Sequence, residues 1–469
     1  MPSLKNLEAA LLQLQGKALE HYGAIEILIN SPAGISEHTD YVAEIIRHAK
    51  ALSECEEAYG SLNTHFVPKP EPASPVQINE NRPATRPEPV DGAITIDENN
   101  SATMKRAQKR AASRKKGKLK KMTNNLNNDA LTYDDVLLQP QYSEIRSRSD
   151  IDIGSDLGRG IKLDLPIFSS PMDTVTGGQM AASIYKLGGA GIIHRYNSIE
   201  EQVLEVVSAY ENSVNSTSPI LGAAIGISGD YLERATALLS AGVDFLCVDV
   251  AHGHHIMMKE ALENLRNLTS DFHIMAGNVA TLQGVNDLAD WGADSVRCNI
   301  GGGSICSTRI QTGHGLPGLQ TIFECAQTDR DVAIIADGGI RNSGDIVKAL
   351  AAGADAVMCG SLLSGTTETP GNVFEGADGF KYKAYRGMAS KEAQMSWRGK
   401  YSSFEGVSSQ VPFRGTVTKI LEDIERGVRS GFSYTGACSL KELQSKAKFV
   451  RQTSAGLGES RTHINTRKW

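Results

Sequence analysis

The feature of this sequence that most limits its fold is a series of eight short apolar runs in its C-terminal two-thirds. They lie at 165–170, 189–194, 220–226, 244–250, 273–278, 294–299, 332–337 and 355–360. Between most of them lie segments with amphipathic helical spacing, such as MKEALENLRNL and SGDIVKALAAG. Short runs that are apolar throughout are typical of parallel strands buried on both faces. Eight alternating units predict an α/β fold of the closed (β/α)8 barrel type, because closure leaves no edge strand; an open, doubly wound sheet is the alternative.

Polar or glycine-rich residues follow the carboxyl ends of these runs. The main examples are 170–173, 249–254, 301–306, 337–339 and 360–361. In a (β/α)8 barrel the carboxyl ends of all strands meet at one rim, where ligand binding and catalysis take place. The sequence therefore predicts one site built from these loops.

The N-terminal part of the chain has a different composition. Residues 1–64 carry leucines at three- and four-residue spacing, which predicts an N-terminal helical segment. Residues 65–121 form a linker that is rich in proline and then in Lys and Arg, and we expect it to be disordered. Its stretch 105–121 holds ten Lys or Arg and no acid, so it is either a solvated tail or a contact for a polyanion. The barrel is expected at 122–469, with a flap at 385–415.

The overall composition excludes several classes of protein. A formal net charge of −6 does not indicate a nucleic-acid-binding protein. No apolar run reaches the roughly 18 residues of a membrane span, and the first residues lack the apolar core of a signal peptide. The seven cysteines are scattered without a CxxC pair, which favours free thiols in a reducing compartment. We therefore expect a cytoplasmic protein with no membrane contact.

The loops after the sixth, seventh and eighth runs have the composition of a phosphate site. Ser304, 337–339 and 360–361 supply glycines and serines whose backbone N–H groups can face an anion. A helix that starts after the eighth run is expected to add its positive end. The alternative is that these glycines only make tight turns. Asp337 cannot itself bind a phosphate and is expected to accept hydrogen bonds from sugar hydroxyls.

Cys306 lies in the glycine-rich stretch NIGGGSICSTRIQTGHG, on the loop after the sixth run. Three other cysteines lie inside predicted strands and are expected to fill space there: Cys247, Cys298 and Cys359. A thiolate on a loop is instead a strong nucleophile. Thr308 could share the handling of its proton, and Arg309 could hold the loop shut or favour the thiolate.

Residues 385–415 are polar, punctuated by glycine and too long for a simple connector. We interpret them as a flap that closes over the rim and excludes water. Glu405 is the acid in the C-terminal half of this flap. It is either a solvated carboxylate, a contact for a purine ring N–H, or a group that acts as a general base with Thr308.

Long motifs in this chain resemble the IMP dehydrogenase/GMP reductase family. The chief ones are LTYDDVLLQP (131–140), SSPMDTVT (169–176), VDVAHGH (248–254), AGNVAT (276–281), GGGSICSTR (301–309), IADGGIRNSGDIVKALAAGADAVMCGSLL (335–363) and YRGMAS (385–390). The likeness covers about residues 129–464. It implies a (β/α)8 barrel that acts on a purine nucleoside 5′-monophosphate with a nicotinamide dinucleotide, NADPH or NAD.

The resemblance implies a role for most of the rim residues. Cys306 would attack C2 of the purine and form a covalent thioimidate, with Thr308 and Glu405 as its catalytic partners. The substrate-binding residues would be Ser170, Met172, Ser304, Asp337, Gly338, Gly339, Gly360, Ser361, Tyr385, Gly387, Met388 and Ala389. The cofactor side of the pocket would be formed by Asp249, Asn278 and Arg297.

The resemblance also implies a cation and an assembly. Gly301, Gly303 and the carbonyl of Cys306 match a loop that binds potassium, and Glu459 of a neighbouring subunit would complete it. The segment SAGLGES (454–460) looks like the tail that carries this glutamate. A homotetramer is the assembly that the likeness implies.

Members of this family run the chemistry in opposite directions. Dehydrogenases convert IMP, NAD and water to XMP and NADH, and they activate the water with an adjacent Arg-Tyr pair on the flap. Reductases convert GMP and NADPH to IMP and ammonia. Here the nearest arrangement on the flap is Arg398-Gly-Lys-Tyr401, whereas Thr308 and Glu405, the pair that reductases use to handle ammonia, are both present. We therefore expect a GMP reductase, although GAAIGISGD and SAGLGES look dehydrogenase-like. IMP dehydrogenase is the alternative, followed by a non-catalytic protein that binds purine nucleotides.

Overall fold

The computed structural model describes residues 47, 50, 51, 129–213, 220–268, 271–400 and 405–462. Residues 47, 50 and 51 are helical and belong to a first compact unit, Met1–Ile96. The predicted helical segment and linker, 1–64 and 65–121, otherwise lie outside the described residues and stay predictions. Everything below concerns the second unit, Asp97–Trp469.

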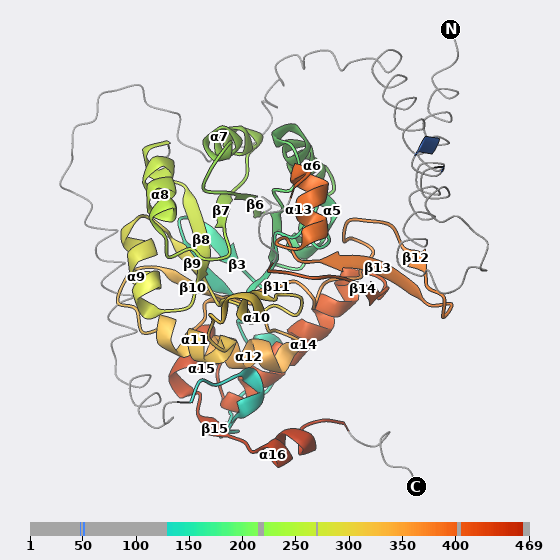
Figure 1. Cartoon of the computed structure of the whole chain (residues 1–469). Helices are drawn as coiled ribbons and strands as arrows, with labels where there is room; N and C mark the ends of the chain where they lie inside the picture. The colour runs from blue at the N-terminus through green and yellow to red at the C-terminus, as the bar shows by residue number, and fades with distance from the viewer. Residues whose placement is uncertain are drawn as a thin grey trace, which may run out of the picture. The chain divides into compact units, whose positions relative to one another are not determined.

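Eight parallel strands close into a barrel, which confirms the (β/α)8 prediction and excludes the open sheet (Figure 1). In chain order they are β4 (Ile167–Ser169), β5 (Ala190–Ile193), β6 (Leu221–Ile225), β7 (Phe245–Asp249), β8 (His273–Val279), β9 (Ser295–Cys298), β10 (Ala333–Asp337) and β11 (Ala356–Cys359). β11 pairs with β4 and closes the ring, with Val357 opposite Ile167. Within these strands every residue is buried except Asp249, Asn278 and Asp337, which are half-buried. The three exceptions are polar and are all predicted site residues.

Alternate strand residues fill the barrel interior. They form one cluster with the hairpin β2 (Ser155–Gly158)–β3 (Ile161–Leu163), made up chiefly of Leu157, Ile161, Leu163, Phe168, Ile192, Phe245, Cys247, Met275, Ile335 and Met358. The rings of Phe168 and Phe245 meet edge to face with centroids 5.6 Å apart. A Cβ at Gly222 would lie 2.2 Å from the Phe245 ring, so this ring occupies space that only glycine leaves. Because the hairpin side of the interior is packed, a ligand has room only at the opposite, carboxyl end of the strands.

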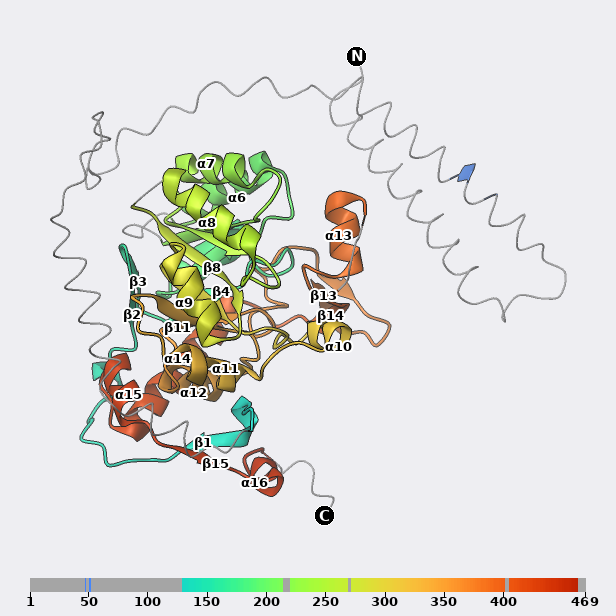
Figure 2. The same cartoon turned by 60° about the vertical axis from the view of Figure 1, so that its left-hand side comes forward.

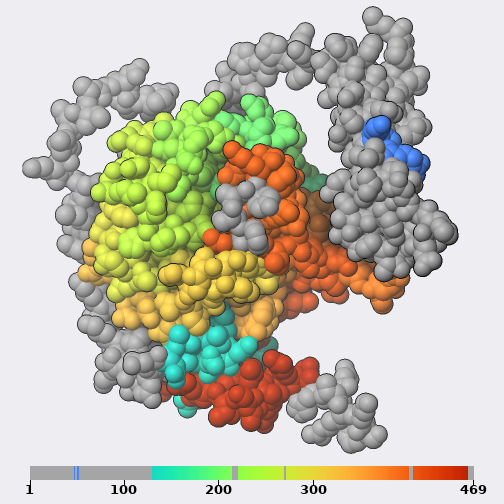
Figure 3. Space-filling view, in the orientation of Figure 1, coloured from blue at the N-terminus to red at the C-terminus, as the bar shows by residue number. Residues whose placement is uncertain are grey.

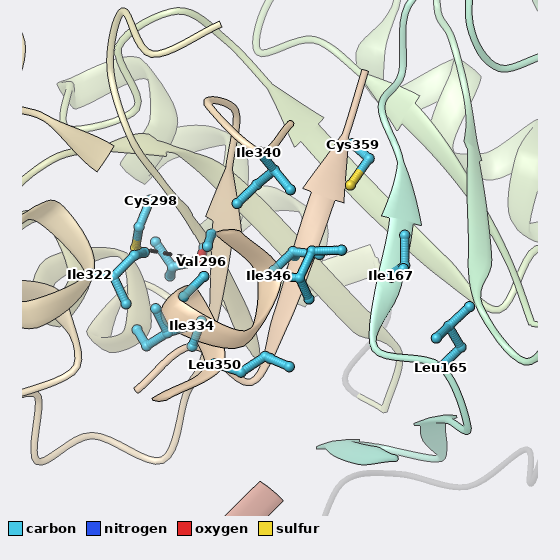
Figure 4. Close-up of a cluster of buried hydrophobic side chains, with 14 of the residues drawn as sticks. Leu165, Ile167, Val296, Cys298, Ile322, Ile334, Ile340, Ile346, Leu350 and Cys359 are labelled. Carbon is cyan, nitrogen blue, oxygen red and sulfur yellow. Dashed lines mark hydrogen bonds between the residues drawn. The ribbon is translucent and has the colours of Figure 1, made fainter. Parts of the chain in front are cut away.

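A second apolar layer joins the strands to the surrounding helices. The helices are α5 (Gly178–Tyr185), α6 (Ile199–Glu211), α7 (Tyr231–Ala241), α8 (Ile256–Leu268), α9 (Leu282–Asp290), α11 (Gly318–Cys325), α12 (Ser343–Ala351) and α14 (Val417–Thr435). Figure 4 shows part of this layer, where side chains of α11 and α12 meet those of β9, β10 and β11. Cys298 and Cys359 lie here and Cys247 lies in the barrel interior, all fully buried, as predicted for space-filling thiols. Helix starts are fixed locally; at α6, Ser198 and Glu201 cap each other's backbone N–H groups.

The described segments before β2 and after α14 pack against each other. η2 (Tyr133–Asp135) leads into β1 (Val136–Leu138), which pairs antiparallel with β15 (Phe449–Arg451). η3 (Arg148–Asp150), α15 (Leu440–Lys446) and α16 (Ser454–Glu459) complete this part. Within the described ranges, no helix has the length and apolarity needed to cross a bilayer.

The predicted flap, 385–415, belongs to a separate small sheet at the mouth of the barrel that begins before it, at residue 374. β12 (Phe374–Glu375), β13 (Lys381–Arg386) and β14 (Ser408–Pro412) pair antiparallel, and α13 (Lys391–Arg398) lies between β13 and β14 in the chain. Figure 2 shows α13 and this sheet on the same side as α10 (Thr308–Thr312), the short helix after Cys306. In the space-filling view the flap, in orange, lies between the green β5–α6 region and the yellow region of α10 (Figure 3).

Candidate active site

One cavity of about 440 Å³ opens at the carboxyl ends of the strands. It brings together all the predicted catalytic, substrate and cofactor residues: Ser170, Met172, Asp249, Asn278, Arg297, Ser304, Cys306, Thr308, Asp337, Gly338, Gly339, Gly360, Ser361, Tyr385, Gly387, Met388, Ala389 and Glu405. Gly301 and Gly303 of the predicted potassium loop line it as well. The predicted residue that does not line it is Glu459, which ends α16.

Cys306, Thr308 and Glu405 form a hydrogen-bonded chain in this cavity. The Cys306 thiol donates to Thr308 Oγ1 over 3.1 Å, and the Thr308 hydroxyl donates to Glu405 Oε2 over 2.8 Å. Thr308 is buried, whereas Cys306 and Glu405 are half-buried and face the cavity. The chain can carry a proton between a nucleophilic sulfur and a carboxylate through one hydroxyl.

The loop that carries Cys306 is fixed from two sides. Arg309 Nε donates to the carbonyl of Ile300 over 3.1 Å, and its guanidinium also donates to the carbonyl of Leu316. Arg309 therefore holds the loop, which is one of the two roles expected from the sequence. On the flap side, Ser307 N–H donates to the carbonyl of Glu405 over 2.8 Å, and Cys306 forms an isolated antiparallel bridge with Gly406.

The expected phosphate cradle is a ring of small residues. Gly338 and Gly339 both have positive φ, at 82° and 76°, and a Cβ at Gly360 would lie 3.2 Å from the Tyr385 hydroxyl oxygen. Burial raises the pKa of Tyr385, so its hydroxyl keeps its proton. The hydroxyl oxygen lies 3.4 Å from Ser304 Oγ. The backbone N–H groups and hydroxyls of such a ring are suited to an anion.

One expectation for this cradle is wrong. The residues after β11 do not begin a helix; Leu363 and Ser364 N–H groups both bond back to the carbonyl of Gly360 in a single turn. Arg414 then donates to the carbonyls of Ser361 and Leu362, each over 2.9 Å, and so takes the acceptors that a second helical turn would use. No helix dipole contributes to the site at this point.

A buried ion cluster lies on the other side of the cavity. Arg297 donates to Asp249 Oδ1 over 2.5 Å and to Asp337 Oδ2 over 2.8 Å, and Asn278 also donates to Asp337 Oδ2, over 2.7 Å. Burial opposes the charge of Arg297, but Asp337 and Asp249 outweigh it and hold the pKa of the guanidinium above its ordinary value. Asn278 Oδ1 is buried with no hydrogen-bond partner among the described residues, so it is an acceptor without a donor inside the pocket.

The flap is tied to the barrel beside the expected base-binding residues. Arg386 Nε donates to Asp173 Oδ2 over 2.8 Å, and the N–H of Asp173 lies 3.3 Å from the Met388 sulfur. Glu405 N–H donates to the carbonyl of Ala389 over 3.1 Å. The two halves of the flap are therefore joined to each other and to the loop after β4.

Several further pocket residues have no role predicted from the sequence, among them the polar residues Arg195, Tyr196, Asn299, Gln394 and Arg398. Arg195 and Tyr196 directly follow the second apolar run, and the strand pattern places Arg195 at the rim, as the structure does. Gln394 and Arg398 lie on α13, and nothing in the sequence indicates which face of that helix meets the cavity.

Side-chain metal ligands do not gather in the described part of the chain, where no group of three His, Cys, Asp or Glu is suitably placed. The predicted potassium loop would use carbonyls instead. One of them, that of Gly303, accepts the Cys306 N–H over 3.1 Å.

Residues 130–463 match the family model described as IMP dehydrogenase / GMP reductase domain. The inosine-5′-monophosphate dehydrogenase of Nitrosopumilus maritimus (strain SCM1) is 34% identical, over 71% of this chain and 98% of the relative. The GMP reductase of Leishmania major is 32% identical, over 71% of this chain and 97% of the relative. A crystal structure of a Cys-to-Ala variant of GMP reductase from Trypanosoma brucei in complex with guanosine 5′-monophosphate superposes with a TM-score of 0.68 at 30% identity, over 73% of this chain and 99% of that one.

Proposed function

This chain belongs to the IMP dehydrogenase/GMP reductase family, and we propose that within it the protein is a GMP reductase, which converts GMP and NADPH to IMP, ammonia and NADP⁺. The observation that carries this proposal is the hydrogen-bonded chain from Cys306 through Thr308 to Glu405. It supplies a nucleophile and a proton route, which are the two things that removal of an amino group from a purine ring needs.

In the proposed reaction the Cys306 thiol gives up its proton through Thr308 to Glu405, and its sulfur forms a bond to C2 of GMP. The 2-amino group takes up a proton through Thr308 and Glu405 and leaves as ammonia, which breaks the C2–N bond and leaves a thioimidate on Cys306. A hydride then reaches C2, the C2–S bond breaks with its electron pair on sulfur, and IMP is formed. The same chain that delivered the proton is in place to stabilise the returning thiolate.

The rest of the cavity would hold the nucleotide. Ser304, Ser361 and Tyr385 are proposed to bind the 5′-phosphate with the glycine N–H groups described above. The hydrogen bonds that Asp337 accepts from described residues all go to Oδ2, so Oδ1 is the proposed acceptor for a ribose hydroxyl. Met388 is proposed to contact the base.

The dinucleotide would enter beside Asp249 and Asn278. The partnerless acceptor Asn278 Oδ1 fits the carboxamide N–H₂ of a nicotinamide, and Arg297 holds Asp249 in place next to it. When bound, this cofactor supplies the hydride. The choice of NADPH over NADH belongs to the proposal, as do the potassium ion at Gly301 and Gly303 and the tetramer that would bring Glu459 of a neighbouring subunit to it.

The second candidate is IMP dehydrogenase, the activity named for several similar relatives, including that of Aquifex aeolicus (strain VF5) at 34% identity. The hydride step would run in reverse, from IMP and NAD to the thioimidate and NADH, and water would then attack the thioimidate at C2 and release XMP. We rank it second because the flap sequence around Arg398 and Tyr401 lacks an adjacent Arg-Tyr pair, whereas the Thr308–Glu405 hydrogen bond is present.

A pair of assays tests this proposal. The absorbance of reduced nicotinamide is followed with GMP plus NADPH, and separately with IMP plus NAD without ammonia. We expect a decrease in the first mixture, and we expect Cys306→Ala to bind GMP without turnover. A steady increase in absorbance in the second mixture, with no change in the first, would instead assign the dehydrogenase. Turnover by the Cys306→Ala variant would remove the thiol from the mechanism.

A further inference from the structure

A stacked aromatic pair joins the flap to the barrel at the edge of the cavity. The rings of Tyr196, on the loop after β5, and Trp397, on α13, lie nearly parallel at 14° with centroids 4.2 Å apart. Such a stack stabilises the contact beyond the burial of the rings themselves. It also fixes the position of the residue next to each ring in the chain.

Those two neighbours are both arginines. The Arg195 guanidinium carbon lies 5.5 Å from the Tyr196 centroid and 5.4 Å from the Trp397 centroid, and the Arg398 guanidinium carbon lies 4.4 Å from the Trp397 centroid. Cation–π contacts of this kind orient a guanidinium without neutralising it. Both arginines line the cavity.

Neither charge is balanced by a carboxylate within the described ranges. Arg297, in the same cavity, has ion pairs with two aspartates, but no ion pair involves Arg195 or Arg398. Arg195 has one weak hydrogen bond, from Nη2 to the backbone carbonyl of Asp249 over 3.3 Å, and its Nε is buried with no partner. Burial raises the pKa of Tyr196 despite the two guanidiniums, so the phenol is neutral and offers no compensating charge.

We propose that Arg195 and Arg398, presented by the Tyr196–Trp397 stack, bind a phosphate group of the dinucleotide cofactor. A guanidinium offers several N–H donors in a planar fork that matches phosphate oxygens, and a buried donor without an acceptor marks where such an oxygen would lie. This inference rests on the proposed function only in that a nicotinamide dinucleotide is the second ligand.

The position of Arg195 favours the dinucleotide over the 5′-phosphate of GMP. Its guanidinium lies on the β6–β7 side, beside the Asp249 carbonyl and 3.6 Å from where a Cβ of Gly226 would be. The proposed cradle for GMP is built instead from the loops after β9 and β11 and from β13, around Ser304, Ser361 and Tyr385. Because Trp397 and Arg398 belong to the flap, the phosphate subsite is complete only when the flap is docked, and a bound dinucleotide would stabilise that docking.

The test compares Arg195→Met, Arg398→Met and the matched control Lys400→Met, which removes an equal charge from an exposed residue two positions on that does not line the cavity. The dissociation constants of NADPH and NADH are measured by nicotinamide fluorescence, and the KM values of dinucleotide and GMP are measured where turnover allows. We expect each arginine variant to weaken dinucleotide binding roughly 10- to 100-fold, as for a lost charged hydrogen bond, with the control unchanged.

The two dinucleotides separate the two possible phosphates. A loss for NADPH alone identifies the 2′-phosphate, and an equal loss for both identifies the diphosphate bridge; either supports the proposal. Trp397→Ala should lower the affinity as well, and Trp397→Phe should restore most of it. Unchanged affinity for both dinucleotides in both arginine variants overturns the proposal, as does a KM for GMP that rises by the same factor as that for the dinucleotide. Fluorescence needs no turnover, so the result stands even if the reaction proves to be the dehydrogenase's.

Discussion

Replacing Thr308 by valine tests the proton route that supports the reductase assignment. Valine keeps the shape and volume of threonine but removes the hydroxyl that joins the Cys306 thiol, at 3.1 Å, to the Glu405 carboxylate, at 2.8 Å. Thr308 is buried in the wall of the cavity, where the bound nucleotide would leave little room for a water in its place. The thiol and the carboxylate should therefore stay where they are with nothing between them.

The expected loss follows from these two contacts. A hydrogen bond to a charged carboxylate contributes about 1.5–3 kcal/mol, and a positioned acid–base group contributes about 10²–10⁴-fold to a rate. We therefore expect kcat with GMP and NADPH to fall by about 10²–10⁴, which corresponds to roughly 2.7–5.5 kcal/mol in the activation free energy. Thr308→Ser, which keeps the hydroxyl, is the matched control and should keep most of the rate.

A single turnover of IMP with NADP⁺ isolates the step that needs no ammonia. It forms the thioimidate and NADPH, so it uses the Cys306 sulfur and the hydride transfer but not the amino group. In Thr308→Val this step should fall far less than GMP turnover does. The reasoning is refuted if both reactions fall by the same factor, or if GMP turnover stays within about threefold of the unmodified protein.

The other predictions concern the barrel and its ribose subsite. Phe245→Ala should lower the free energy of unfolding by about 3–5 kcal/mol in denaturant titrations, because the ring fills the barrel interior against Phe168 and Gly222; a loss below about 1 kcal/mol would contradict that packing. Asp337→Asn should raise the KM for GMP at least about tenfold, since the proposed ribose acceptor loses its charge, and an unchanged KM would move the ribose elsewhere. Burial lowers the pKa of His273 from 6.5 to about 4. As the pH falls, His273 therefore takes up a proton in the unfolded chain before it does so in the folded protein. The free energy of unfolding should decrease between pH 6.5 and pH 4, by at most about 3 kcal/mol. His273→Gln should flatten that part of the profile, whereas a profile that keeps its slope in the variant would assign the loss to other groups.

The barrel could be predicted because its signal is local. Each strand is short and buried throughout, so it reads as an unbroken apolar run, and the three half-buried strand residues are the polar ones, Asp249, Asn278 and Asp337. By contrast, the contact between Thr308 and Glu405 joins residues 97 positions apart. Their pairing was one of the alternatives for Glu405 and is implied by the family likeness, but no spacing in the chain predicts it.

Two features of the structure that the sequence did not predict have similar physical causes. The residues after β11 look suited to start a helix, but the carbonyls that would continue it are taken by Arg414, which lies 53 positions away from Ser361. The stack of Tyr196 on Trp397 was not foreseen, since each aromatic residue alone is as compatible with a packed core as with a pocket wall. In both cases a side chain from the flap contacts a loop on the barrel.

The flap therefore does more than cover the site. In the proposed reaction it would supply Tyr385 to the phosphate cradle, Met388 to the base, Glu405 to the proton route and Trp397 to the dinucleotide edge. These contributions depend on one docking, because Gly406 pairs with Cys306 and the Glu405 carbonyl accepts the Ser307 N–H. If the dinucleotide phosphate holds α13 down as proposed, cofactor binding would also favour the position of Glu405 beside Thr308. Ammonia loss would then be fastest when both ligands are bound, and a GMP complex without dinucleotide should form the thioimidate slowly.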